Sequence, residues 1–289
     1  MTKTEKENLI NSLIQRKEVF DVLGIKIMAD ADFDIAQRMI PYIPTINPIT
    51  NPVGRIISKD EALSRSYKYL NLFGKSYADR VSNKLDNIEI KEVFEYTFCF
   101  TTNVTYKLDE ETKKINKDSG NIDHLKTPII FDEVSPMWLA HEHIHNLKEL
   151  YYDEYSEGQV LGDVIPMFFE LLIADQESSE KEKVYIKNRL FLLKNEINGL
   201  EYAKSILSDQ KDLYKVFATS AMQYINSYYY SLRLYDLYES GNEEVVTKIK
   251  EVLDGEKTTK SILKELGLLY NYSERKTRKG IQKVLNRIK

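Results

Sequence analysis

Residues 138–145 read Trp138-Leu139-Ala140-His141-Glu142-His143-Ile144-His145, and this stretch decides the expected fold. It contains the pattern H-E-x-x-H, with His141 and His145 four residues apart. On a helix this spacing places both imidazoles on one face, one turn apart, where they can share a zinc ion. Glu142 lies about 100° round the helix from His141, close enough to take a proton from an attacking water. The stretch therefore predicts a zinc site with Glu142 as general base.

The residues around this pattern are largely apolar, so we expect the helix to be buried. Buried histidine and glutamate side chains need partners, and a metal ion supplies them. His143 lies about 200° from His141 at helical pitch, so we expect it to be a core or surface residue and not a ligand.

Composition limits the classes of protein to consider. The chain has 289 residues, 42% of them hydrophobic, and a formal net charge of -4 with no basic footprint for nucleic acid. Its one cysteine excludes an intramolecular disulfide. The polar, charged start argues against a signal peptide, and the lack of a long apolar run argues against a membrane span. We therefore expect a cytoplasmic protein without nucleic-acid or membrane partners.

Helical patterns dominate the first part of the chain. Apolar periodicity predicts helices over residues 4–23, 32–39, 58–73 and 77–85, which form an N-terminal helical region, residues 1–87. Ser58 followed by Glu61 three residues later is a capping-box signature.

The amino-acid composition changes near residue 88, where aromatic and β-branched residues become frequent. Residues 93–106 and 127–131 are expected to form strands, separated by an exposed polar loop over 109–121. A small β-sheet would then precede the metal-binding helix, with Ser135 as its cap and Pro136 at its first position. The edge of such a sheet can hold an extended peptide, although the strands could equally do no more than brace the helix.

Two acids stand in an otherwise apolar segment after the histidines. Asp163 and Glu170 are seven residues apart and would share one face of a helix. Metal ligation, or support of a ligand, would explain their presence there. The alternative is an N-terminal cap at Asp163 and a salt bridge at Glu170.

This layout resembles the gluzincin peptidases of the thimet oligopeptidase and oligoendopeptidase F family. In that family a second helix follows H-E-x-x-H and carries a glutamate ligand, with another glutamate seven positions later. The resemblance implies zinc on His141 and His145, Glu142 as general base, Asp163 as third ligand in place of glutamate, and Glu170 as a group behind the ligands. Glu170 remains the rival ligand because its side chain is longer.

The later part of the chain adds to this resemblance. After two expected helices, which include residues 185–196 and 200–207, a tyrosine-dense helix covers residues 223–238. In the family a tyrosine hydroxyl from this region stabilises the oxyanion of the tetrahedral intermediate. Tyr224, Tyr228 and Tyr229 are the candidates here, against the alternative that all three are packing residues.

The expected fold is therefore mostly α. It comprises a zincin-like catalytic domain over residues 88–289, a helical bundle with a small β-sheet before the metal helix, which follows residues 1–87 or is continuous with them. The expected function is zinc-dependent hydrolysis of short peptides. A catalytically inactive, zincin-like binding or regulatory protein is the alternative, and the aspartate at position 163 supports it. Ile144 also stands where the family usually has glycine.

Overall fold

The computed structural model describes residues 3–23, 30–47, 54–85, 103–108, 115–123, 132–147, 161–176 and 179–288, and this part is mostly helical. In chain order the elements are α1 (Lys3–Leu23), α2 (Asp30–Met39), η1 (Ile40–Tyr42), α3 (Lys59–Leu70), α4 (Lys75–Leu85), β1 (Asn103–Leu108), β2 (Ile115–Asp123), α5 (Ser135–Leu147), α7 (Val164–Ala174), α8 (Ser179–Ile206), α9 (Lys211–Glu239), α10 (Glu244–Leu253), α11 (Thr259–Glu265) and α12 (Glu274–Arg287).

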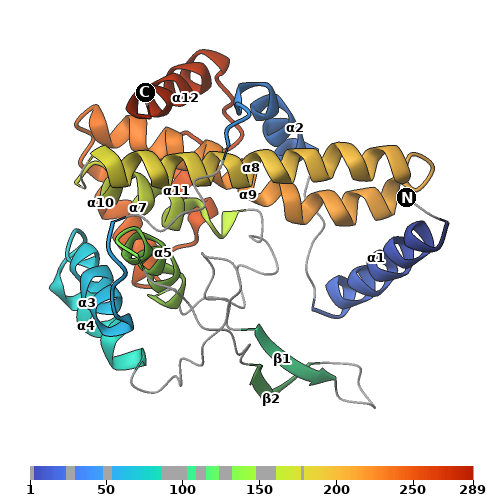
Figure 1. The fold of residues 1–289 in the computed structure, drawn as a ribbon, viewed down its shortest axis with the longest axis horizontal. Helices are drawn as coiled ribbons and strands as arrows, with labels where there is room; N and C mark the ends of the chain where they lie inside the picture. The colour runs from blue at the N-terminus through green and yellow to red at the C-terminus, as the bar shows by residue number, and fades with distance from the viewer. Residues whose placement is uncertain are drawn as a thin grey trace.

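Two long helices, α8 and α9, pack side by side and form the axis of the molecule (Figure 1). The sequence predicted separate helices over residues 185–196 and 200–207, and this was wrong because α8 continues unbroken through Gly199. A glycine inside a helix costs about 1 kcal/mol relative to alanine, which the packing of α8 on α9 outweighs. A Cβ at Gly199 would lie 3.8 Å from the ring of Phe217 on α9, so the two helices approach closely there.

The centre of the core is α7, in which every residue from Val164 to Ala174 is buried. Its sequence is apolar all round, apart from Glu170, and such a helix is stable only when neighbours cover every side. α5 and α9 both pack against α7, and α3 packs against α5. This arrangement places α5 in the interior, between an N-terminal helix and the core helix.

The N-terminal helices largely follow their predicted positions. α1, α2, α3 and α4 begin or end within three residues of the ranges expected from periodicity. The capping box at the start of α3 is present, since Oγ of Ser58 accepts a hydrogen bond of 3.1 Å from the backbone N–H of Glu61. α4 also contacts α5, so both α3 and α4 cover the helix that carries the histidines.

The small β-sheet expected from residues 93–106 and 127–131 is not borne out. The described strands are β1 and β2, an antiparallel pair with an irregularity between Thr105 and Lys107. β2 falls largely within residues 109–121, which the sequence predicted to be an exposed loop. Polarity misled that prediction, because a ladder is held by main-chain hydrogen bonds that polar residues can also make. Residues 93–102 and 127–131 lie outside the described part of the chain.

We find no membrane-spanning candidate among the helices of the described residues, since none combines sufficient length with sufficient apolar character.

Candidate metal centre

The helix that carries the histidines begins with a reciprocal cap. Oδ1 of Asp132 accepts hydrogen bonds from the backbone N–H groups of Val134 (3.0 Å) and Ser135 (2.9 Å). Oγ of Ser135 in turn accepts one of 2.9 Å from the backbone N–H of Asp132. The sequence predicted Ser135 as the cap, whereas the structure gives that role to Asp132 and makes Ser135 its partner. Pro136 lies in the first turn, where its missing N–H costs nothing.

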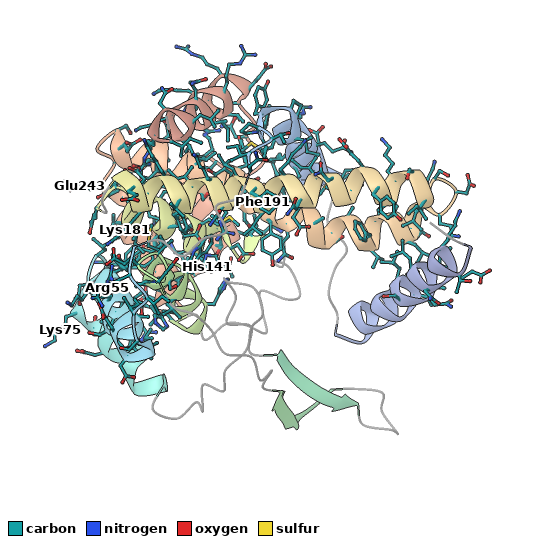
Figure 2. All side chains as sticks on the ribbon, in the orientation of Figure 1. Arg55, Lys75, His141, Lys181, Phe191 and Glu243 are labelled. Atoms are coloured by element: carbon teal, nitrogen blue, oxygen red, sulfur yellow. The ribbon has the colours of Figure 1, made fainter. Side chains whose placement is uncertain are left out.

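Three possible ligand atoms from α5 and the start of α7 converge on one point. Nε2 of His141 lies 3.1 Å from Nε2 of His145 and 3.3 Å from Oδ1 of Asp163. Nε2 of His145 lies 3.2 Å from the same oxygen. Figure 2 labels His141 where α5 meets the centre of the bundle. His141, His145 and Asp163 form a group that could hold a metal ion.

The dimensions of this triangle fit a tetrahedral ion. Ligands about 2.0–2.1 Å from zinc at tetrahedral angles are separated by roughly 3.3–3.4 Å. The three observed distances of 3.1, 3.2 and 3.3 Å agree with that geometry. Two imidazoles and one carboxylate are also a donor set that zinc accepts, and three ligands leave its fourth position open. The side chains of His141 and Asp163 are only 7% and 8% exposed, and that of His145 is 16% exposed.

Asp163 occupies the N-cap position of α7, yet its side chain makes no capping hydrogen bond. Its Oδ1 faces the two histidines, while its Oδ2 accepts a hydrogen bond of 3.4 Å from Nε2 of Gln223 on α9. Burial disfavours the charged carboxylate, but hydrogen bonds from His141 and His145 outweigh burial and hold the pKa of Asp163 well below its usual value. The carboxylate is therefore charged and directed at the imidazoles.

Glu170 lies on the other side of the His141 ring. Its Oε1 is 2.6 Å from Nδ1 of His141, the nitrogen that points away from Asp163. Both of its oxygens accept hydrogen bonds from Arg189 on α8, from Nε at 3.1 Å and from Nη2. Burial opposes ionisation, but the charge of Arg189 and the contact with His141 lower the pKa of Glu170. The salt bridge considered for Glu170 from the sequence is thus present, together with a contact to a histidine.

The other residues that the sequence predicted for the site are Glu142 and the tyrosines of α9. Glu142 lies on α5, but its side chain falls outside the described part of the structure. Tyr224 on α9 is 36% exposed and follows Gln223, which reaches Asp163. Tyr228 is buried, which raises the pKa of its hydroxyl, and it lies within the fields of Arg189 and Glu170.

Tyr229 uses its hydroxyl elsewhere. This hydroxyl donates a hydrogen bond of 3.0 Å to the backbone oxygen of Asn271. It accepts hydrogen bonds from Nη1 of Arg233 at 2.9 Å and from the backbone N–H of Ser273 at 3.3 Å. The bonds to Asn271 and Ser273 join α9 to the segment before α12, and the bond from Arg233 lies within α9.

His143 faces α3, away from the metal centre. Its Nε2 is 2.9 Å from Oγ of Ser66, and its ring stacks on Tyr67 with centroids 5.0 Å apart. Burial lowers the pKa of His143 to about 3, so the imidazole is neutral. His143 is therefore a core residue that joins α5 to α3, one of the two roles predicted from its helical angle.

Reasoning from the sequence missed two residues, Arg189 and Gln223. Arg189 directly follows Lys187 and Asn188 and precedes the apolar residues 190–193, so the sequence alone does not mark its charge as buried. Gln223 carries no signal either, because it is one polar residue among several on α9.

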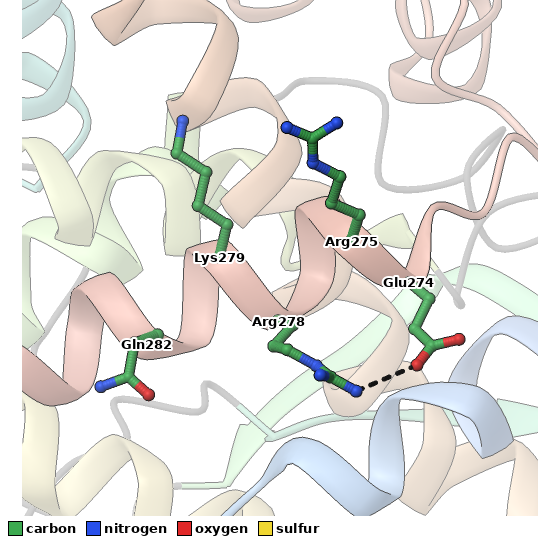
Figure 3. A pocket seen from close by; sticks show the side chains of 5 residues that line it. All are labelled: Glu274, Arg275, Arg278, Lys279 and Gln282. Carbon is green, nitrogen blue, oxygen red and sulfur yellow. Dashed lines mark hydrogen bonds and ion pairs between the residues drawn. The ribbon is translucent and has the colours of Figure 1, made fainter.

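A separate hollow on the outward side of α12 lies apart from this centre (Figure 3). The residues that line it come from one helix and are mostly cationic: Glu274, Arg275, Arg278, Lys279 and Gln282. An open surface formed by a single helix does not enclose a ligand, so this hollow is not a candidate site.

Comparison with known proteins gives one informative match. No protein-family model matches the sequence, and no curated protein matches it at a significant level. A solved structure that does match is the crystal structure of a "putative peptidase" from Chlamydophila abortus, with 15% sequence identity and a TM-score of 0.50. The match covers 100% of this chain and 55% of that one, so this chain spans about half the length of its structural neighbour. At this identity the similarity concerns the fold alone.

Proposed function

We propose that this protein is a zinc-dependent peptidase that hydrolyses short peptides. The observation that carries this proposal is the convergence of His141, His145 and Asp163 at tetrahedral distances on a helix with the sequence H-E-x-x-H. Support also comes from the fold, which is similar to that of a protein named as a peptidase. The resemblance to the thimet oligopeptidase and oligoendopeptidase F family supports a zincin-like type for the domain.

Each residue of the centre has a distinct task in this proposal. His141, His145 and Asp163 would hold the ion, which supplies Lewis-acid activation of water and of the scissile carbonyl. Glu142 would take a proton from the attacking water and deliver it to the leaving amine. Glu170 would keep the ring of His141 in place through the contact at Nδ1.

Tyr224 is the preferred oxyanion donor among the three tyrosines. It is partly exposed, so a substrate could reach its hydroxyl, and in sequence it follows Gln223, whose side chain donates to Asp163. Tyr228 is buried within the fields of Arg189 and Glu170, and Tyr229 already makes three hydrogen bonds with its hydroxyl. If Tyr224 is the donor, the three hydrogen bonds of Tyr229 stay in place during the reaction.

The decisive experiment measures cleavage of a mixed set of short, internally quenched peptides by the full chain loaded with zinc. We expect cleavage that a chelator abolishes and that added zinc restores. Glu142→Gln should lower the rate by about 100- to 10,000-fold, because it removes the general base while the ligands stay. Glu201→Gln, which changes an exposed glutamate on α8, is the matched control and should leave the rate unchanged.

A zincin-like binding protein without turnover is the second candidate, and Asp163 in place of the family's glutamate favours it. Tight zinc binding by the wild-type chain, without cleavage of any peptide in the set, would support this alternative. Failure to bind zinc would exclude both candidates.

A further inference from the structure

We propose that Arg189 is a positioning residue of the metal centre, which acts through Glu170 on the ring of His141. This inference rests on the proposed function, because it assigns His141 to a zinc ion. Arg189 belongs to α8, whereas the ligands come from α5 and the start of α7. α8 would thus take part in forming the site, in addition to α9, which supplies Gln223.

The first step is the contact between Arg189 and Glu170. Nε of Arg189 donates to Oε2 of Glu170 at 3.1 Å, and Nη2 donates to Oε1. Two parallel bonds from a planar guanidinium fix the plane of a carboxylate, which a single bond cannot do. The side chains are 10% and 2% exposed, so water does not compete for these positions.

The second step is the contact between Glu170 and His141. Oε1, which Arg189 holds, is also 2.6 Å from Nδ1 of His141. An ionised carboxylate can only accept hydrogen bonds, so this contact favours a proton on Nδ1. With the proton held on Nδ1, Nε2 is the nitrogen left to bind an ion placed between His145 and Asp163.

The third step is the contact between Arg189 and Trp138 of α5, the helix that carries His141. Its guanidinium lies 4.7 Å from the centre of the Trp138 ring, and Trp138 precedes His141 by one turn on α5. The ring of Trp138 also packs on that of Tyr185, with centroids 4.4 Å apart. The guanidinium is therefore held by hydrogen bonds in its plane and by an aromatic face above it, a combination that lysine cannot reproduce.

A purely structural ion pair would show the same contacts, so the test must separate metal binding from stability. Arg287 provides a matched control, because it pairs with Asp175 and Glu182 and lies 5.9 Å from the ring centre of Tyr235. Like Arg189, Arg287 is an arginine with carboxylate partners and an aromatic neighbour, and its side chain is only 14% exposed. Neither of its carboxylate partners belongs to the metal centre.

The experiment compares Arg189→Lys and Arg287→Lys with the wild-type chain. Zinc affinity is measured by competition with a chromophoric chelator, and unfolding by urea is measured in excess chelator. We expect Arg189→Lys to weaken zinc binding by about 10- to 100-fold, as for other partners of metal-bound histidines. Arg287→Lys should change zinc affinity by less than about twofold. Equal zinc affinity in wild type and Arg189→Lys would overturn the inference.

A second measurement needs no zinc. With four histidines in the chain, ¹⁵N NMR of the metal-free protein can assign the tautomer of His141. We expect Nδ1 to carry a proton in the wild type and to be only partly protonated in Arg189→Lys. A wild-type Nδ1 without a proton would refute the role of Glu170 and Arg189 directly. A wild-type chain with the expected tautomer but no zinc affinity would instead refute the proposed function alone.

Discussion

Oδ1 of Asp163 lies 3.2 Å from Nε2 of His145, although the two residues are eighteen positions apart and belong to different elements. Glu170, the other acid considered from the sequence, reaches the opposite nitrogen of His141 at 2.6 Å. The two carboxylates therefore stand on either side of one imidazole ring. Only the side that holds Asp163 also contains the second histidine.

This arrangement predicts that Asp163→Asn weakens zinc binding more than Glu170→Gln. The first change removes the charge from a proposed ligand, and the second alters only a partner of a ligand. For Glu170→Gln we expect a loss of about 10- to 100-fold, and for Asp163→Asn a larger one. Competition with a chelator measures both. The reverse order would identify Glu170 as the third ligand.

Tyr224→Phe should lower kcat by about 100- to 1,000-fold with little change in KM, if its hydroxyl stabilises the oxyanion. Tyr202→Phe is the control, because Tyr202 is a 55% exposed tyrosine on α8. Tyr229→Phe should lower the free energy of unfolding and leave kcat unchanged, since its hydroxyl joins α9 to Asn271. Steady-state kinetics on one cleaved peptide test all three variants. A wild-type kcat in Tyr224→Phe would place the donor elsewhere.

The buried imidazole of His143 should make the free energy of unfolding depend on pH. Burial lowers its pKa from 6.5 to about 3, so the unfolded chain binds a proton that the folded chain does not bind between these pH values. As far as His143 is concerned, the free energy of unfolding is highest above pH 6.5. It falls by up to about 1.4 kcal/mol per pH unit as the pH is lowered toward 3. Urea unfolding in excess chelator, repeated across this pH range, measures the slope.

The variant His143→Phe keeps a ring against Tyr67 but cannot titrate, so it should flatten this slope. Ser66→Ala removes the hydrogen-bond partner and keeps the histidine, so the slope should persist at lower absolute stability. Identical slopes in wild type and His143→Phe would assign the pH dependence to other groups.

The hydrogen bonds of Arg80 hold α4 to α5 and to the end of α10. Its guanidinium bonds to Oδ1 of Asp254 at 2.8 Å and to the backbone oxygens of Leu253 at 3.0 Å and Leu147 at 3.3 Å. We expect Arg80→Met to lower the free energy of unfolding by about 1–3 kcal/mol, because Leu147 ends α5 and loses a donor. Arg278→Met, at a 71% exposed ion pair, should cost less than about 0.5 kcal/mol. Similar losses in both variants would contradict this role.

Local patterns predicted the local features of this protein. The spacing of His141 and His145 needs only helical pitch to bring the two rings together, and the structure shows their Nε2 atoms 3.1 Å apart. The cap of α3 depends on Ser58 and Glu61, three residues apart, and it too was readable from the sequence. Such features involve residues within one turn, so their geometry follows from the backbone alone.

Strand positions could not be predicted in the same way. The polar residues of β2 resemble a loop in composition, and their pairing with β1 depends on main-chain hydrogen bonds between separate segments. The single helix α8 was also misjudged, because its continuity through Gly199 depends on packing against α9.

The sequence by itself determined that two histidines would share a helical face and that two acids would follow on an apolar segment. Only the tertiary structure decided which acid meets both histidines and which meets Arg189. The physical reason is that seven residues of spacing put Asp163 and Glu170 on one face but about two turns apart, so different parts of α5 and α8 lie opposite them. That choice depends on how α5, α7 and α8 pack, which no single stretch of sequence contains.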